Sequence, residues 1–109
     1  MAYDEGVAQR VREYFTDRTD ITEKKMFGGL AFLVSGHMCV GVINDELMAR
    51  VGPEQYPAAL QEPHAREMDF TGRPMKGFVY IGAEGYNDDH DLQSWIHRCE
   101  KFVSTLEPK

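Results

Sequence analysis

The chain has 109 residues, of which 42% are hydrophobic and 28% are charged, and its formal net charge is −6. This balance is typical of a globular protein and excludes a disordered chain, and the length predicts a single domain over residues 1–109. The longest apolar stretch, residues 28–34, is too short to span a bilayer, and the acidic N-terminus is unlike a secretory signal. We therefore expect a cytoplasmic protein without membrane association.

Residues 3–17 are predicted to form an amphipathic helix, because apolar residues recur there every three or four positions. These residues are Val7, Val11, Tyr14 and Phe15. From residue 24 the apolar period changes to two, which predicts a run of strands. Their expected ranges are 24–27, 30–34, 38–43 and 47–51. Turn signals at 35–36 and 44–45 leave so few residues between strands that the pairing must be antiparallel.

Strict alternation along the expected strand 38–43 would place Met38, Val40 and Val42 on the face opposite Cys39, Gly41 and Ile43. The same rule separates Leu47, Ala49 and Val51 from Met48 and Arg50. Both cysteines, Cys39 and Cys99, lie in apolar patterns and are expected to be small buried side chains without a disulfide.

After the Gly-Pro pair at 52–53, a short helix is predicted over residues 53–61, followed by two strands over 67–70 and 76–81. The last segment carries an unbroken helical stripe, with acidic N-cap candidates at 87–89. The stripe consists of Leu92, Trp95, Ile96, Cys99, Phe102, Val103 and Leu106. Its expected partners on the sheet are Leu30, Phe32, Val40, Val42 and Phe78.

The predicted order is therefore helix, three or four strands, helix, two strands, helix. Helices at both ends of a run of strands predict an α+β fold in two layers, with an antiparallel sheet flanked by helices.

No catalytic or metal-binding motif stands out. The pair Gly28-Gly29 lacks the spacing of a phosphate loop and is expected to mark a bulge or a close backbone approach. The four histidines have no partners at metal-ligand spacing. We therefore expect no cofactor, no metal and no enzymatic activity.

The strongest candidate for a binding surface is a basic patch with an apolar centre, a composition that protein interfaces favour. Its candidate residues are Lys24, Lys25, Met26, Arg50, Arg73, Met75 and Lys76. The alternative is that the charged members are separate, solvated or ion-paired side chains. Direct nucleic-acid binding is not expected, because the chain is net acidic and has no basic run longer than Lys24-Lys25.

Four ordered blocks resemble the N-terminal domain of TfoX/Sxy proteins. They are MFGGLAF at 26–32, GHM at 36–38, LMARVG at 47–52 and MDFTGRPMKGFVY at 68–80. The chain is similar to a stand-alone form that lacks the family's helical C-terminal domain. The resemblance implies an α+β fold related to secretion chaperones and a role in transcriptional regulation of natural competence, alongside a cAMP-receptor-type activator. It offers no catalytic residues to transfer.

These observations predict a non-enzymatic regulatory or adaptor domain that acts through contacts with a protein partner. One alternative is a regulator that contacts DNA directly. Another is a sensor of a small anion held by Arg50, Arg73 and Lys76. An exposed sheet edge or a methionine-rich face would also allow a homodimer.

Overall fold

The computed structural model describes residues 3–26, 28–68 and 76–107, and in these ranges it contains three α-helices, six strands and one 3₁₀ turn. The helices are α1 (Glu5–Tyr14), α2 (Tyr56–Leu60) and α3 (Asp89–Val103). The strands are β1 (Ile21–Met26), β2 (Gly29–Val34), β3 (His37–Ile43), β4 (Glu46–Arg50), β5 (Ala65–Glu67) and β6 (Phe78–Ile81). The 3₁₀ turn, Ala83–Gly85, precedes α3. Within the described residues, no helix is both long and apolar enough to cross a membrane.

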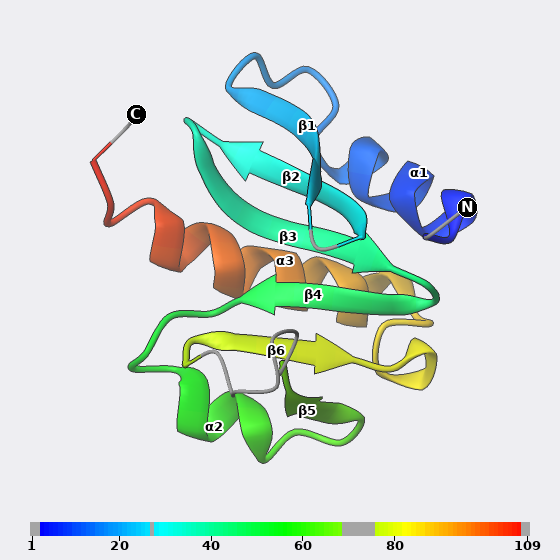
Figure 1. Cartoon of the computed structure of the whole chain (residues 1–109), viewed down its shortest axis with the longest axis vertical. Coiled ribbons are helices and arrows are strands. Elements are labelled where there is room, and N and C mark those ends of the chain that lie inside the picture. The colour runs from blue at the N-terminus through cyan, green and yellow to red at the C-terminus, as the bar shows by residue number, and fades with distance from the viewer. Residues whose placement is uncertain (1–2, 27, 69–75, 108–109) are drawn as a thin grey trace.

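All six strands form one antiparallel sheet in the order β1-β2-β3-β4-β6-β5 (Figure 1). Two-residue turns join β2 to β3 and β3 to β4. In the first of these turns Ser35 and Gly36 both have positive φ, 51° and 88°, which matches the twist of the flanking strands. The predicted α+β class, the antiparallel pairing and the element order are confirmed.

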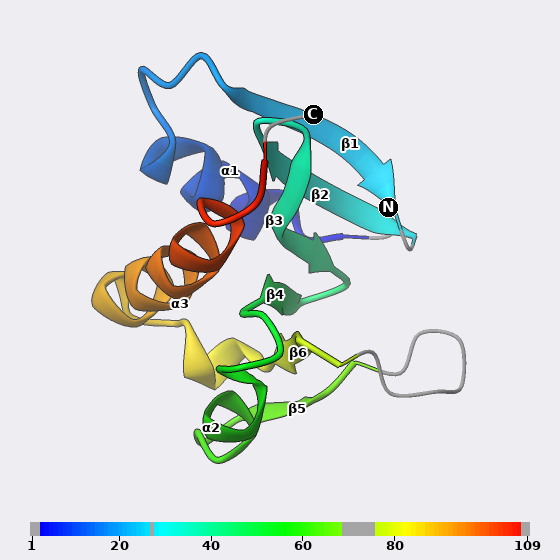
Figure 2. The ribbon, with the colours of Figure 1, turned by 90° about the vertical axis from the view of Figure 1, so that its left-hand side faces the viewer.

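Helices α1 and α3 lie on the same face of the sheet, so the molecule has two layers (Figures 1 and 2). The predicted stripe of α3 is confirmed, because most of its residues are buried in one cluster with α1 and the inner face of the sheet, here called the helix-side core. Leu30, Phe32, Val40 and Val42 pack there as expected. Helix α2 extends this layer beside β5 and β6 through Ala59.

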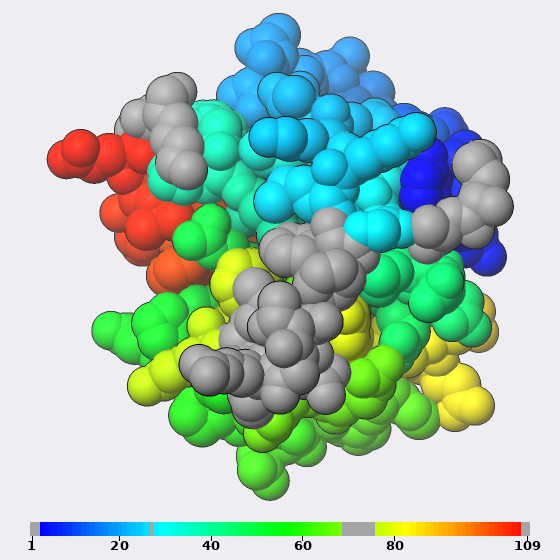
Figure 3. Space-filling model, in the orientation of Figure 1, coloured from blue at the N-terminus to red at the C-terminus, as the bar shows by residue number. Residues whose placement is uncertain are grey.

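Phe78 was expected beneath α3, and that expectation is wrong. The register pairs Phe78 with Arg50 and Val79 with Ala49, so Val79 faces the helices and Phe78 faces the opposite side. There it packs against a second cluster, here called the outer cluster. Its buried members are Ala31, Met38, Met48, Met68 and Tyr80. Figure 3 views the molecule from this side, with β1 at one end of the face and α2 with β5 at the other.

The alternation expected along β3 is broken at Cys39. Phe32 pairs with Val40 and the next residue, Leu33, pairs with Met38, so Cys39 is an extra residue on β3. Because of this bulge, Cys39 joins Val40 in the helix-side core, while Met38 lies in the outer cluster. The alternation predicted for β4 is confirmed, with Leu47, Ala49 and Val51 in the helix-side core and Met48 in the outer cluster.

Several predicted boundaries shift. The helix expected over 53–61 contains five residues, Tyr56–Leu60, because Pro57 can occupy only its first turn. The strand expected over 67–70 is found at Ala65–Glu67, and residues 69–75 lie outside the described part of the chain. The N-cap expected at 87–89 is Asp88, whose carboxylate accepts a hydrogen bond from the backbone N–H of His90 at 2.7 Å.

Tyr86 anchors the loop before α3, since its buried hydroxyl donates to the backbone carbonyl oxygen of Asp45. Burial, with the nearby charge of Asp45, raises the pKa of Tyr86 to about 12. The unfolded chain would lose this proton near pH 10, about the value for a free tyrosine. The stabilisation from the protonated hydroxyl is therefore fully present below about pH 10 and is lost as the pH rises through about 12.

Tyr86→Phe is expected to lower the free energy of unfolding by about 1 kcal/mol at neutral pH, the contribution of one hydrogen bond. The difference between wild type and variant should shrink as the pH rises from about 10 to about 12. Chemical denaturation of both proteins across this range measures it. A difference that stays constant with pH would contradict the assignment to this hydroxyl.

Candidate functional site

Arg50 differs from the other arginines that the structure describes. The structure describes six arginines, and each of the five others has a carboxylate oxygen within 4.0 Å. The pairs are Arg10 with Asp89, Arg12 with Glu23, Arg18 with Asp20 and Glu100, Arg66 with Glu46, and Arg98 with Glu62. Arg50 has no such partner among the described residues, so its charge is not neutralised by a side chain of the described fold.

Aromatic rings and one backbone carbonyl hold Arg50 in place at the end of β4. Its guanidinium carbon lies 5.5 Å from the ring centre of Phe78 and 5.4 Å from that of Phe102. One terminal nitrogen, Nη1, donates to the carbonyl oxygen of Met38 at 3.3 Å. Cation–π contacts of this kind contribute roughly 0.5–2 kcal/mol each. The half-buried side chain is therefore positioned, while the other guanidinium N–H donors have no described protein partner.

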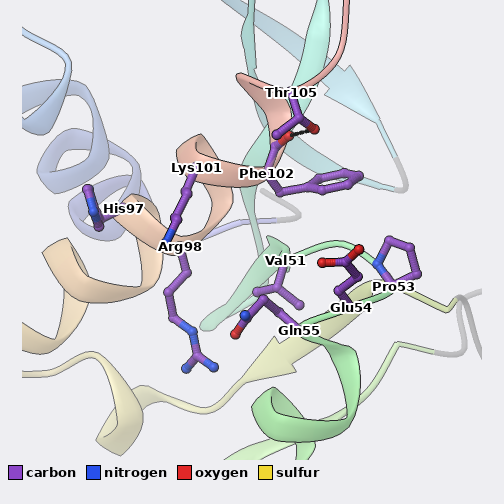
Figure 4. A pocket seen from close by; sticks show the side chains of 9 residues that line it. All are labelled: Val51, Pro53, Glu54, Gln55, His97, Arg98, Lys101, Phe102 and Thr105. Atoms are coloured by element: carbon purple, nitrogen blue, oxygen red, sulfur yellow. Dashed lines mark hydrogen bonds between the residues drawn. The ribbon is translucent and has the colours of Figure 1, made fainter.

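A groove of about 490 Å³ lies beside this arginine, between residues 51–55 and the second half of α3 (Figure 4). Pro53 and Phe102 contribute apolar surface to its lining, whereas Val51 borders the groove but is almost fully buried. Phe102 also contacts Arg50, so the groove and the guanidinium share one ring.

Gly52 allows the chain to pass close to this ring. Its φ is +89°, and a Cβ built on it would lie 2.3 Å from Cδ1 of Phe102. Any other residue would be strained in its backbone and would push into the ring. The glycine thus fixes the relative positions of residues 51–55 and α3 that create the groove.

The charges lining the groove are mostly positive. His97 and Lys101 are exposed, and neither has a carboxylate oxygen within 4.0 Å in the part of the chain that the structure describes. Arg98 is paired with Glu62 at 3.1 Å and lies over the ring of Trp95, 4.7 Å from its centre. The acid that lines this groove is Glu54. The lining therefore combines apolar surface with the ammonium group of Lys101, which has no carboxylate partner among the described residues.

The structure disperses part of the predicted basic patch. Lys24 pairs across the sheet with Ala31, so it shares the outer face with Met26, whereas Lys25 pairs with Leu30 and points to the helix side. Three strand spacings, about 14 Å, separate β1 from β4. These three residues therefore do not join Arg50 in one patch.

Lys76 does lie at the same end of the sheet as Arg50. The carbonyl oxygen of the next residue, Gly77, accepts hydrogen bonds from the backbone N–H groups of Val51 and Gly52, at 2.9 and 3.1 Å. The side chain of Lys76 belongs to an exposed residue. Arg73 and Met75, the other two members of the predicted patch, lie outside the described residues, and the binding role of the patch remains a prediction.

The sequence interpretation did not select the α3 residues of the groove. Phe102 belonged to the predicted apolar stripe, and His97 was expected on the polar side of the same helix. A signal was present in the Gly-Pro pair at 52–53, which marks a close approach or a turn, but nothing in the sequence indicated that this turn meets residue 102. Their proximity arises from packing between segments about fifty positions apart.

The described residues offer little else for chemistry. No group of three or more His, Cys, Asp or Glu side chains among them is arranged to hold a metal ion. A second hollow of about 370 Å³ lies between residues 62–64 and the first half of α3. Some of the charged side chains that line it already pair with one another. Arg98 pairs with Glu62, and Nε2 of His64 lies 3.7 Å from a carboxylate oxygen of Glu84.

An antiparallel sheet covered by helices on one face, with a positioned arginine beside an open groove, defines a small α+β domain with a candidate binding site. The model of the TfoX N-terminal domain matches residues 13–103, so the chain belongs to that family. The match includes Arg50, Phe102 and the whole lining of the groove except Thr105. No match was found among curated proteins or among solved structures.

Proposed function

We propose that this domain is a non-enzymatic regulatory or adaptor module that binds a protein partner in transcriptional control, with Arg50 and the adjacent groove as the contact surface. The observation that carries the proposal is the guanidinium of Arg50. It is held by Phe78, Phe102 and the carbonyl of Met38, yet it has no carboxylate partner among the described residues. Arginine and aromatic side chains in such an arrangement are typical of the central residues of protein interfaces.

Charge favours a protein over a nucleic acid as the partner. The chain has a formal net charge of −6, which repels a phosphate backbone at long range. Tight binding to a duplex depends on several lysines and arginines that neutralise phosphates together. Most described arginines are instead paired with acids of the same chain. The family resemblance adds a cAMP-receptor-type activator as the partner to test first, with competence genes as the regulated set.

Arg50→Gln is expected to weaken binding to the purified cAMP-receptor-type activator by about tenfold, because an interface that buries the charge pair loses its charge-assisted hydrogen bonds. Arg12→Gln is the matched control, since it removes the same charge from an exposed ion pair on α1. The control should change the affinity less than about twofold. Biolayer interferometry with the full chain immobilised measures both affinities, and thermal melting verifies that each variant is folded.

Absence of binding by the wild-type chain to the activator, in the presence or absence of RNA polymerase, would contradict the proposal. Equal affinities of wild type and a folded Arg50→Gln variant would contradict the assignment of this surface.

A further inference from the structure

We infer that the Arg50 site and the groove together take one extended segment of a partner protein, which places a carboxylate on Arg50 and, from two positions along the segment, a bulky apolar side chain in the groove. This inference rests on the proposed function and adds the chemistry of the segment that is bound.

The geometry of the Arg50 guanidinium indicates that the bound segment carries a carboxylate. The Arg50 side chain is held between Phe78 and Phe102, so little conformational freedom remains to be lost on binding. A planar guanidinium whose remaining N–H donors have no partner among the described residues matches the two oxygens of a carboxylate, and such paired hydrogen bonds are strong and directional. Because the side chain is half-buried, its charge is screened less by water and salt than that of an exposed lysine.

The apolar side chain follows from the lining and size of the groove. Pro53 and Phe102 provide apolar surface, and the volume of about 490 Å³ is within the range of cavities that hold small organic groups. Burial of a Leu-sized or Phe-sized side chain there would remove apolar surface of both partners from water, which is the main favourable contribution to association.

The spacing of the two groups follows from the ring that they share. Arg50 and the groove both contact Phe102, and the guanidinium carbon is 5.4 Å from its ring centre. An extended chain advances about 3.3–3.6 Å per residue. Successive side chains of an extended segment point to opposite sides, so a carboxylate and an apolar side chain two positions apart, about 7 Å along the chain, can reach both places at once.

The ammonium group of Lys101 favours an acidic segment over a neutral one. Lys101 lines the same groove and has no carboxylate partner among the described residues, so it can pair with a further carboxylate of the segment. The net charge of −6 opposes the approach of any anionic segment at long range, so the attraction of these cations acts only once the segment is close to the groove. Arg50 and Lys101 together therefore favour a segment that combines a few carboxylates with an apolar side chain, and disfavour a polyanion.

The test is an NMR titration of the full chain with the capped peptide Gly-Ser-Phe-Ser-Asp-Gly, in which the two side chains are two positions apart. We expect shifts of the Nε–Hε resonance of Arg50 and of the backbone amides of Lys101 and Phe102. A peptide with Asn in place of Asp, and one with Gly in place of Phe, should each bind about tenfold more weakly. Arg50→Gln should weaken binding of the parent peptide by a similar factor, and Arg12→Gln should leave it unchanged within about twofold.

Three outcomes would overturn the inference. The first is the absence of shifts at these residues up to millimolar peptide. The second is binding of benzoate as tight as that of the peptide, which would make the site one for a small organic anion. The third is a stronger, salt-dependent shift of the same resonances with a DNA duplex, which would make it a phosphate contact.

The two proposals can fail separately. If the activator binds through Arg50 but the peptides do not bind, the domain has the proposed function and the inferred segment chemistry is wrong. If the peptide binds at Arg50 but the activator does not bind, the segment chemistry holds and the proposed partner is wrong.

Discussion

Replacement of Gly29 with alanine is expected to lower the free energy of unfolding by about 3 kcal/mol, the upper end of the usual effect of overpacking. An ideal Cβ on Gly29 would lie 2.1 Å from the backbone oxygen of Val42 and 3.1 Å from Cα of Ile43. Because these are backbone atoms of β3, the clash is relieved only by a shift of one strand relative to the other. The close backbone approach predicted from the Gly28-Gly29 pair is therefore found at Gly29.

Urea denaturation of the variant measures this loss. Gly82→Ala is the matched control, because its φ is −69° and the nearest atom to a new Cβ, the carbonyl oxygen of His64, is 3.8 Å away. The control should leave stability unchanged or raise it slightly, by restricting the unfolded chain. A Gly29→Ala variant as stable as Gly82→Ala would show that β2 and β3 are not as close as described.

Phe32→Ala is expected to lower the free energy of unfolding by about 3–5 kcal/mol, as is usual when a buried aromatic ring is removed. Phe32 is fully buried in the helix-side core and its ring centre lies 6.3 Å from that of Phe15. The cavity left behind would lie inside the helix-side core, beside Phe15 at the end of α1, where the packed elements cannot all close around it.

Leu33→Ala is the control for this effect, because Leu33 is the next residue of β2 but lies half-buried on the outer face. Its loss should be less than half of that of Phe32→Ala, since less apolar surface returns to water. Denaturation curves of both variants give the comparison. Equal losses would mean that the two faces of the sheet contribute equally to stability.

The regular spacing of apolar residues predicted correctly those elements in which one whole face is buried. The stripe on α3 and the alternation in β4 are both found as predicted, because one whole face of each is buried. Cys39 was placed on the wrong face because a bulge inserts one residue, and the sequence shows no compositional sign of it. Phe78 was misplaced because an aromatic residue in a strand fits either face, and only the pairing with β4 determines which one.

The candidate site was predicted only in part, because the sequence showed its strand residue but not the contacts made by tertiary packing. Arg50 was selected as a member of the basic patch, and the alternation along the strand separated it from Leu47 and Val51. The groove residues were not identified, because Gly52 and Phe102 meet only through tertiary packing. The similarity to secretion-chaperone folds, also expected from the family, remains a prediction.

The bulge in β3 also has a consequence for the chemistry of the two thiols. It turns Cys39 into the helix-side core beside Cys99 of α3, and neither side chain is accessible to solvent. The neighbouring Cys99 thiol, together with burial, holds the pKa of Cys39 above its usual range, so the reactive thiolate is suppressed. Alkylating reagents can therefore modify these thiols only in molecules in which α3 has separated from the sheet. The rate of alkylation would then measure how often the two layers come apart, a property that the sheet and helix patterns alone do not reveal.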